Sequence, residues 1–439
     1  MMTKMYSEMV NRETGQTSLL NQPNGVRTSM RSALGESGSA VADRAGVSAV
    51  SPASRAAAAS GSRVAIVTSL HRDFDIRIWR HARLTSTFAE THLICGWAVA
   101  SGTVLDGVTL HTFRHSYSRL TRIANLAGVV ARLLPLLRRV DVIHFHDLDL
   151  LPVMIPLSIV RPVIYDVHEN YAEEMLVRTW VPSRLRRLLF HLVHALHVVA
   201  SRTIGNIVCV VPDQKQEFRH AKRLVLIENF ASSARALEWK DNYLERQPAV
   251  ISTAAQYPAN GTWVLLDIAQ HLQARAPQLE ILAIDHFETQ KLRSEVLRSV
   301  EQRGIRNIRF LPRVEAQRVM EYLNQATVGL ISPLNLIKNA KGLPTKLFEY
   351  MAAGIPCVAG DFPHVAKVVN DSGCGILVAP EDVSAFVDGI LWLTNHPAEA
   401  HSMGMAGRAA FLERYNWEIH GPKLRRLYLE VAGRPADSY

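Results

Sequence analysis

The sequence predicts an α/β protein built from two doubly wound domains, each with a largely parallel sheet. From Arg63 onward, short and nearly continuous apolar segments alternate with longer amphipathic ones. Such short segments are typical of strands buried on both faces of a parallel sheet, and the longer ones are typical of crossover helices. The alternation stops once, in the polar stretch 231–246, and then restarts. Two runs of strand–helix–strand units therefore indicate two domains.

The first run begins with RVAIVTS at Arg63–Ser69, which we expect to be a central strand. Further strands are expected at Thr91–Cys95, Val108–Phe113, Asp141–Phe145, Pro162–Val167, Asn206–Val211 and Ala221–Ile227. Helices are expected at Ile76–Phe88, Arg119–Arg139 and Pro182–Arg202. This half would form an N-terminal domain over 61–232. The preceding residues 1–60 are rich in Ser, Ala, Gly and Arg, which predicts a disordered tail.

The second run follows a linker expected at 233–247. Its strands are expected at Ala249–Thr253, Leu279–Ile284, Ile308–Leu311, Val328–Ile331, Pro356–Ala359 and Gly375–Val378. They predict a C-terminal domain over 248–415, and a last helix within 416–439 would pack back toward the N-terminal domain. Ligands of doubly wound sheets bind beyond the carboxyl ends of the strands, so we expect the two domains to face each other across a ligand-binding cleft.

Composition and missing motifs narrow the class of protein. The four cysteines have no CxxC spacing, which favours reduced thiols and no cysteine zinc site. No GxGxxG follows the first strand and no GxxxxGK[ST] occurs, which argues against dinucleotide oxidoreductases and P-loop NTPases. We see no signal peptide and no apolar run of about 20 residues, so no transmembrane helix is expected.

The segment KGLPTKLFEYMAAGIPCVAG, Lys341–Gly360, carries the strongest functional signal. Pro344 marks the start of a short helix, and Gly354-Ile355-Pro356 marks its end. Thr345, Lys346 and Glu349 would lie within about 100° of one another on that helix. A helix N-terminus and an ammonium group suit a diphosphate, and a carboxylate accepts hydrogen bonds from ribose hydroxyls. The alternative is an amphipathic helix with a solvated polar face.

Charged side chains follow the first strand of the N-terminal domain. His71, Arg72, Asp75 and Arg77 lie where a ligand of such a sheet would bind, so they are candidates for phosphate or acceptor contacts. The alternative for Asp75 is that its carboxylate caps the next helix.

Histidines follow two later strands. His144 lies inside its strand and is expected in the core, whereas His146 could contact phosphate or acceptor. Two imidazoles two residues apart could also hold a metal, but no third ligand is evident, and we predict no metal site. Asp147 would cap the helix that follows. His168 comes directly after the next strand, where an imidazole can act as acid, base or hydrogen-bond donor.

Basic helices account for much of the formal charge of +9. Neither Gly107–Val140 nor Met175–Pro212 contains an acidic residue, and in both stretches Arg alternates with apolar side chains. Such helices bind anionic membrane surfaces, although a solvated basic face is the alternative. No nucleic-acid-binding module is recognisable, so no nucleic acid partner is expected.

With these residues assembled, the chain resembles the GT-B glycosyltransferases, most closely family four, the retaining sugar-nucleotide transferases. The resemblance covers about Arg63 to Tyr428. The donor-binding segment of that family is similar to Gly342–Pro356, and its "G-x-L-V-x-P-x-D" element is similar to Gly375–Asp382. The fold implied is GT-B, with two Rossmann-like domains facing across a cleft.

The resemblance also implies roles for individual residues. Glu349 would hold the donor ribose, Lys346 with the start of the helix would face the diphosphate, and Thr345 and Leu347 would also bind the donor. His168 would lie near the sugar as a catalytic residue. In retaining members, the departing diphosphate takes the proton of the attacking acceptor hydroxyl, so the protein mainly stabilises the leaving group. No metal or other cofactor is implied beyond a UDP- or GDP-linked sugar as substrate.

Three departures from the family pattern keep alternatives open. Lys341 stands where the family has a second carboxylate, the stretch Ala254–Gly261 lacks the usual Arg and Lys, and His71–Asp75 replaces a glycine pair. An inverting GT-B polysaccharide transferase and a non-catalytic GT-B protein that binds a nucleotide sugar or a partner therefore remain alternatives. The leading prediction is a cytoplasmic transferase, peripheral on the inner membrane face, that acts on lipid-linked or polysaccharide acceptors in exopolysaccharide, capsule or lipopolysaccharide biosynthesis.

Overall fold

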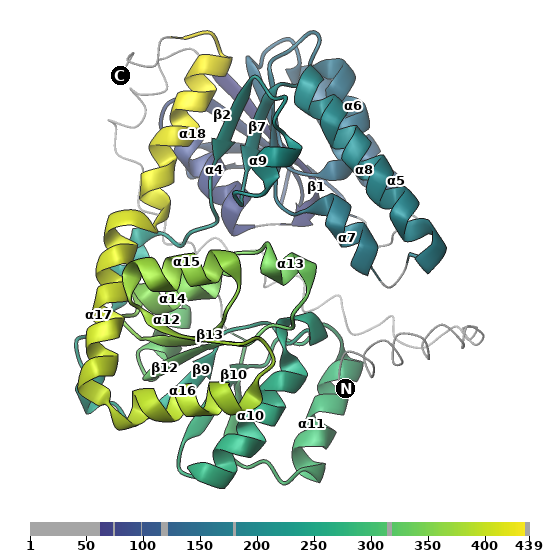
Figure 1. Ribbon diagram of the computed structural model, residues 1–439. Coiled ribbons are helices and arrows are strands. Elements are labelled where there is room, and N and C mark those ends of the chain that lie inside the picture. Colours follow the sequence, from purple (N-terminus) through teal and green to yellow (C-terminus); the bar gives the residue numbers. More distant parts are fainter. Residues whose placement is uncertain are drawn as a thin grey trace, which may run out of the picture. The chain divides into compact units, whose positions relative to one another are not determined.

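The computed structural model describes residues 62–72, 75–97, 99–115, 122–178, 181–313 and 318–434. The tail expected at 1–60 lies outside these residues. Grouped by contacts, the chain forms two compact units, one of Met1–Tyr165 with Tyr171–Ile204 and the other of Asp166–Asn170 with Gly205–Tyr439. Each unit contains parallel strands with helices between them (Figure 1). The predicted α/β class with two doubly wound sheets is therefore confirmed.

The first sheet has eight strands in the order β3-β4-β2-β1-β5-β6-β7-β8. Their bounds are β1 Arg63–Arg72, β2 Glu90–Gly96, β3 Val104–Leu105, β4 Val108–Phe113, β5 Val142–Phe145, β6 Val163–Val167, β7 Asn206–Cys209 and β8 Arg223–Leu226. Only the short hairpin strand β3 pairs antiparallel among the described pairs. The helices are α4 Ile76–Ser86, α5 Arg122–Leu133, α6 Leu151–Leu157, α7 Tyr171–Val177, α8 Ser183–Thr203 and α9 Gln214–Glu217.

The second sheet has six strands in the order β11-β10-β9-β12-β13-β14. They are β9 Ala249–Ser252, β10 Glu280–Ile284, β11 Ile308–Leu311, β12 Val328–Ile331, β13 Cys357–Gly360 and β14 Gly375–Val378, all paired in parallel. The helices are α10 Thr262–Arg275, α11 Gln290–Gln302, α12 Val319–Leu323, α13 Ile337–Ala340, α14 Thr345–Ala352, α15 Pro363–Ser372, α16 Val383–Asn395, α17 Pro397–Arg414 and α18 Trp417–Val431.

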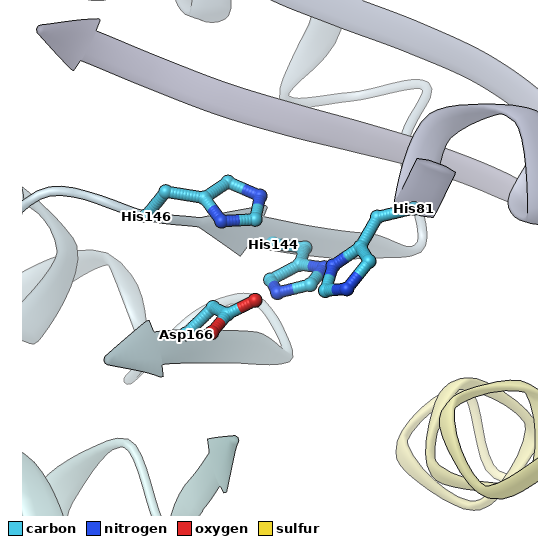
Figure 2. Close-up of side chains that lie close together, drawn as sticks. All are labelled: His81, His144, His146 and Asp166. Atoms are coloured by element: carbon cyan, nitrogen blue, oxygen red, sulfur yellow. The ribbon is translucent and has the colours of Figure 1, made fainter. Parts of the chain in front are cut away.

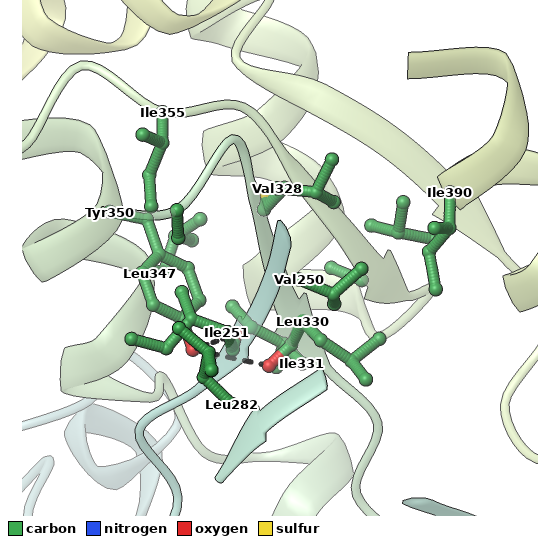
Figure 3. Packing of buried hydrophobic residues seen from close by; sticks show 14 of the residues in the cluster. Val250, Ile251, Leu282, Val328, Leu330, Ile331, Leu347, Tyr350, Ile355 and Ile390 are labelled. Carbon is green, nitrogen blue, oxygen red and sulfur yellow. Dashed lines mark hydrogen bonds between the residues drawn. The ribbon is translucent and has the colours of Figure 1, made fainter. Parts of the chain in front are cut away.

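The core of the second unit lies between this sheet and its helices, and Figure 3 shows part of it. Val250 and Ile251 of β9, Leu330 of β12 and Leu347 of α14 are almost fully buried there. Tyr350 of α14 is buried in the same core, and its hydroxyl lies 3.2 Å from the carbonyl oxygens of both Ile251 and Leu330. This hydroxyl therefore connects α14 to the two central strands.

The stretch expected as a linker, 233–247, is part of the second unit by contacts. It forms the short 3₁₀ turns Ser233–Glu238 and Tyr243–Glu245. The buried Tyr243 donates its hydroxyl proton to Thr327 O at 2.8 Å, and Arg408 of α17 donates to Ala236 O at 2.9 Å and lies 4.2 Å from the Trp239 ring centroid. By contacts, β7 and β8 group with the second unit, although both are strands of the first sheet. The domain boundary expected near residue 232 stays a prediction.

The last helix, α18, packs against β8, a strand expected in the N-terminal domain. Arg223 of β8 donates to the carboxylate of Glu430 at 3.2 Å. Glu418 accepts hydrogen bonds from the hydroxyl of Ser232 and the backbone N–H of Ser233. Among the described helices, none combines the length and the apolar character needed to cross a bilayer.

Candidate functional site

Each sheet has one switch point, which is the place between two neighbouring strands where the chain crosses over to one side from one strand and to the other side from its neighbour. In the second sheet the chain builds from β9 toward β11 on one side and from β12 toward β14 on the other. The loops that follow β9 and β12 therefore diverge, and a crevice is expected at the carboxyl ends of these two strands. Two bonds join the loops at their base: Leu334 N–H donates to Ala259 O at 3.2 Å, and Asn339 Nδ2 donates to the same oxygen at 2.9 Å.

Helix α14 begins directly after the β12 loop, because Pro344 has extended φ and ψ and ends that loop. The helix stops at Gly354, whose φ of +62° is the left-handed conformation that favours glycine. Arg408 donates to Ala352 O at 2.6 Å and satisfies a carbonyl of the last turn. A Cβ on Gly404 would lie only 2.2 Å from Gly354 O, so the absence of a side chain there lets α17 pack closely on the end of α14.

The polar stripe predicted on α14 is present. Thr345, Lys346 and Glu349 are half-buried on the helix, whereas Tyr350 points into the core. Thr253, just after β9, donates its hydroxyl proton to Glu349 Oε2 at 3.4 Å. Burial lowers the pKa of Lys346, and the nearby Glu349 carboxylate partly opposes that shift. An ammonium and a carboxylate thus lie beside the switch point of this sheet, and their binding roles stay predictions.

Leu347 does not belong to this stripe. Its side chain is fully buried in the core cluster of the second unit, because it occupies the apolar face of α14. A donor contact of Leu347 would therefore involve its backbone, and that contact stays a prediction.

The corresponding point of the first sheet lies between β1 and β5. Asp147, fully buried after β5, accepts from Thr68 Oγ1 at 2.6 Å and from the backbone N–H of Ser69 at 2.7 Å. No capping hydrogen bond from Asp147 to the following 3₁₀ turn is made, so the expected helix cap is wrong. The Asp147 carboxylate instead binds Thr68 and Ser69 of β1, which supply its hydroxyl and amide donors.

His71 lies at the end of β1 between two carboxylates. Its Nδ1 is 3.0 Å from Asp75 Oδ2, and its Nε2 is 3.3 Å from Asp147 Oδ1. Asp75 also caps α4, since its Oδ1 accepts from the N–H groups of Arg77 and Ile78. The capping alternative for Asp75 is therefore confirmed. One oxygen of its carboxylate caps α4 and the other contacts His71.

Arg72 and Arg77 were both candidates for a phosphate contact, and the structure describes the side chain of Arg77 alone of the two. The Arg77 side chain is 5% exposed, so burial removes it from the accessible candidates for a phosphate contact. Arg72 is the last residue of β1, and its side chain lies outside the described part of the chain. Its phosphate contact stays a prediction.

His146 is fully buried, which corrects its expected contact with phosphate or acceptor. Its ring centroid lies 4.6 Å from that of His144 and 5.6 Å from that of His81 on α4. Figure 2 shows these three rings together with the carboxylate of Asp166. The core position expected for His144 is confirmed, since that residue too is fully buried.

His168 follows β6, as expected, with a side chain that is 10% exposed. Its Nε2 lies 4.0 Å from Asp166 Oδ2. By contacts, the segment Asp166–Asn170 groups with the second unit, which also contains α14. The catalytic role of His168 stays a prediction.

A family comparison identifies the second unit. Residues 234–410 match the model of the family "Glycosyl transferases group 1". The second unit contains a glycosyl transferases group 1 domain. The predicted resemblance to GT-B glycosyltransferases similar to family four is thereby confirmed. The group 1 domain includes both switch-point loops, the whole of α14 and most of α17.

The curated proteins to which this chain is similar include sugar transferases, as their names state. The phosphatidyl-myo-inositol mannosyltransferase of Mycobacterium tuberculosis (strain CDC 1551 / Oshkosh) is 29% identical over 216 residues, 48% of this chain and 53% of that protein. The D-rhamnosyltransferase WbpZ of Pseudomonas aeruginosa is 28% identical over 125 residues, 28% of this chain and 32% of that protein. The chain thus spans about half the length of the first of these relatives.

Solved structures extend the likeness in fold to both units. Sucrose-phosphate synthase from Thermosynechococcus elongatus superposes with a TM-score of 0.69 at 14% identity, covering 85% of this chain and 99% of that one. Anabaena Alr3699/HepE, solved in complex with UDP-glucose, superposes with a TM-score of 0.63 at 14% identity, covering 84% and 99%. At these identities the likeness concerns the fold, and it confirms the predicted GT-B architecture.

Several residues of the group 1 domain site were not singled out by the sequence. Thr253 and Tyr350 connect α14 to β9, and only the register of strand and helix brings them together. Glu381 has φ of +68° and accepts from Asn335 N–H at 2.8 Å, which ties the turn after β14 to the β12 loop. Gly261 has φ of +83°, and a Cβ there would lie only 1.8 Å from Ser332 O, so the β9 loop approaches the end of β12 closely at this glycine.

Proposed function

We propose that this chain is a glycosyltransferase that moves a sugar from a UDP- or GDP-linked donor to a lipid-linked or polysaccharide acceptor in glycan biosynthesis. The observation that carries the proposal is the stripe of Thr345, Lys346 and Glu349 on α14, beside the switch point of a group 1 domain. The named relatives that transfer mannose and rhamnose support a sugar donor, and the HepE complex supports a nucleotide-linked one.

The diphosphate would bind at the start of α14. Free backbone N–H groups of a first helical turn carry partial positive charge, and the Lys346 ammonium adds a full one. Glu349 would accept hydrogen bonds from the ribose hydroxyls, because an ionised carboxylate has only acceptor atoms. The contact between Thr253 and Glu349 would hold that carboxylate in one orientation before the donor arrives.

The proposed reaction retains the configuration of the transferred sugar. The bond between the anomeric carbon and the diphosphate oxygen breaks while the acceptor hydroxyl attacks from the same face. The acceptor proton passes to the departing diphosphate oxygen, so neither a metal nor a protein base is required. His168 would donate a hydrogen bond near the sugar, and the charge that develops on the diphosphate would be stabilised by Lys346 and α14.

Helix α8 supports an acceptor at an anionic membrane surface. Its apolar residues Leu185, Leu188, Leu192 and Val199 recur at helical spacing and are between 43% and 63% exposed. Arg184 and Arg187 are exposed on the same helix. A helix that presents apolar side chains beside arginines binds anionic lipid by burying the former and pairing the latter. A peripheral place on the cytoplasmic membrane face is therefore part of the proposal.

A donor screen tests the proposed activity. The full chain is incubated with common UDP-, GDP- and ADP-sugars, and thermal shift is read beside release of the nucleoside diphosphate. One donor should raise the unfolding temperature, because a ligand that binds only the native state stabilises it. The same donor should be hydrolysed slowly or transferred. Stable binding of a donor with neither hydrolysis nor transfer would favour the non-catalytic alternative.

Vesicle flotation tests the membrane surface separately. The full chain should float with vesicles of phosphatidylglycerol and phosphatidylcholine and remain behind with phosphatidylcholine alone. The pair Leu188→Ser and Leu192→Ser should abolish flotation, whereas Leu237→Ser, a control at a leucine 86% exposed outside α8, should leave it unchanged. Equal flotation of all three proteins would count against α8 as the contact.

A further inference from the structure

We propose that His81, His144, His146 and Asp166 form a binding site for a divalent transition-metal ion, best matched by Zn²⁺. Each of the four residues offers one ligand atom, and these atoms all lie within 4.8 Å of one another. All four side chains are 0% exposed. This site would be structural.

The register of the first sheet explains why these residues converge. His144 and His146 are two residues apart at the end of β5, so their side chains leave the same face. β6 is parallel to β5, with His144 opposite Ile164 and Phe145 opposite Tyr165. Continued by one step, this register sets Asp166 beside His146. His81, on α4, supplies a third imidazole from the helix, 5.4 Å from His144 between ring centroids.

The side chains point toward one another in Figure 2, with the rings of His81 and His144 next to the carboxylate of Asp166. A tetrahedral zinc with bonds of about 2.0–2.1 Å separates its ligand atoms by about 3.3 Å. Ligand atoms within 4.8 Å therefore need only small side-chain rotations to reach one ion. Four protein ligands without a solvent-exposed position make a closed site, which is the structural rather than the catalytic type.

The chemistry of the ligand set selects the ion. Three neutral imidazoles and one carboxylate suit zinc, copper, iron or nickel and disfavour Mg²⁺ and Ca²⁺, which prefer oxygen ligands. The carboxylate of Asp166 would add the negative charge that stabilises a divalent cation in a buried site. The ion would join α4 to the ends of β5 and β6, next to the β1–β5 switch point.

The test uses the full chain prepared without a histidine tag and without any sugar nucleotide. After dialysis against metal-free buffer, elemental analysis should find about one zinc per chain. Chelator-treated protein should take up one Co²⁺ and develop the strong visible absorption of four-coordinate cobalt, which the hydrated ion lacks. Chelator treatment should also lower the unfolding temperature, and added Zn²⁺ should restore it.

Two variants locate the ion. His144→Gln should lose stoichiometric zinc and the cobalt absorption. His92→Gln is the matched control, because His92 is also buried on this sheet but pairs with His111 at 3.1 Å. The control should keep both signals. If His144→Gln does not fold, the cobalt spectrum and zinc titration of the wild-type protein still show whether the chain binds one ion.

The proposal is overturned if folded wild-type protein binds neither ion in a saturable one-to-one manner. It is also overturned if His144→Gln binds zinc as tightly as wild type does. Either result would make the four residues an ordinary buried polar cluster. Because metal is read directly, these outcomes are independent of whether the chain transfers a sugar.

Discussion

The hydroxyl of Thr253 donates a hydrogen bond of 3.4 Å to Oε2 of Glu349 and so connects the end of β9 with the polar face of α14. The same threonine donates its backbone N–H to the hydroxyl of Tyr350 at 3.2 Å. One residue at the switch point therefore contacts two successive residues of the helix, one on its polar stripe and one facing the core. The predictions for the donor site rest on this arrangement.

Replacing Glu349 should weaken donor binding. Glu349→Ala removes the acceptor for the ribose hydroxyls, and we expect the Kd for the donor or its nucleoside diphosphate to rise more than tenfold, about 1.4 kcal/mol. Isothermal titration with the donor from the screen measures the change. Glu413→Ala, at an exposed carboxylate on α17, is the control and should bind as wild type does. Wild-type affinity in Glu349→Ala would remove this role from Glu349.

Donor affinity should fall at alkaline pH because of Lys346. Burial lowers the pKa of this lysine, so in the free protein its ammonium loses its proton at a lower pH than an ordinary lysine does. The charged form binds diphosphate, so affinity for UDP or GDP should decline as pH rises through that lowered pKa. Lys346→Arg should remove the decline, since a guanidinium stays protonated. A Kd that is independent of pH from about 7 to 10 in wild type would contradict the prediction.

His168 should affect turnover more than binding. His168→Ala removes a donor expected near the transferred sugar, so we expect kcat to fall about a hundredfold, as is typical for loss of one preorganised donor. The Kd for the nucleoside diphosphate should change little, since Lys346 and Glu349 remain. His396→Ala, at an exposed histidine following α16, is the control. Unaltered turnover in His168→Ala would exclude His168 from the mechanism.

Gly261 should tolerate no side chain. It has φ of +83°, and a Cβ there would lie 1.8 Å from Ser332 O, the residue directly after β12. Gly261→Ala should therefore lower the free energy of unfolding by about 3 kcal/mol, through backbone strain and steric overlap together. Gly304→Ala separates the two causes: its φ is +63° and no atom lies within 4 Å of the added Cβ. Denaturant unfolding should show a loss near 1 kcal/mol there.

The sequence predicted nearly all strands of both sheets, because strands buried on both faces are almost wholly apolar and stand out from the helices between them. It did not predict the hairpin strand β3, whose two residues carry too little pattern. The polar composition of the expected linker did not predict its long-range contacts: Tyr243, Trp239 and Ala236 contact residues that lie far away in the chain.

For the candidate site, helical periodicity alone determined that Thr345, Lys346 and Glu349 share a stripe, since residues three and four apart lie on one face. Which charged residues face solvent was decided only by tertiary structure. His146 and Arg77 look accessible in a polar stretch but are buried. Helix α4, which carries Arg77, packs on β2 and β1, and Asp147 binds β1 rather than the nearby helix. His81 and Asp166, far from His144 in sequence, meet it only through strand register and helix packing, which are long-range contacts that local residue patterns do not encode.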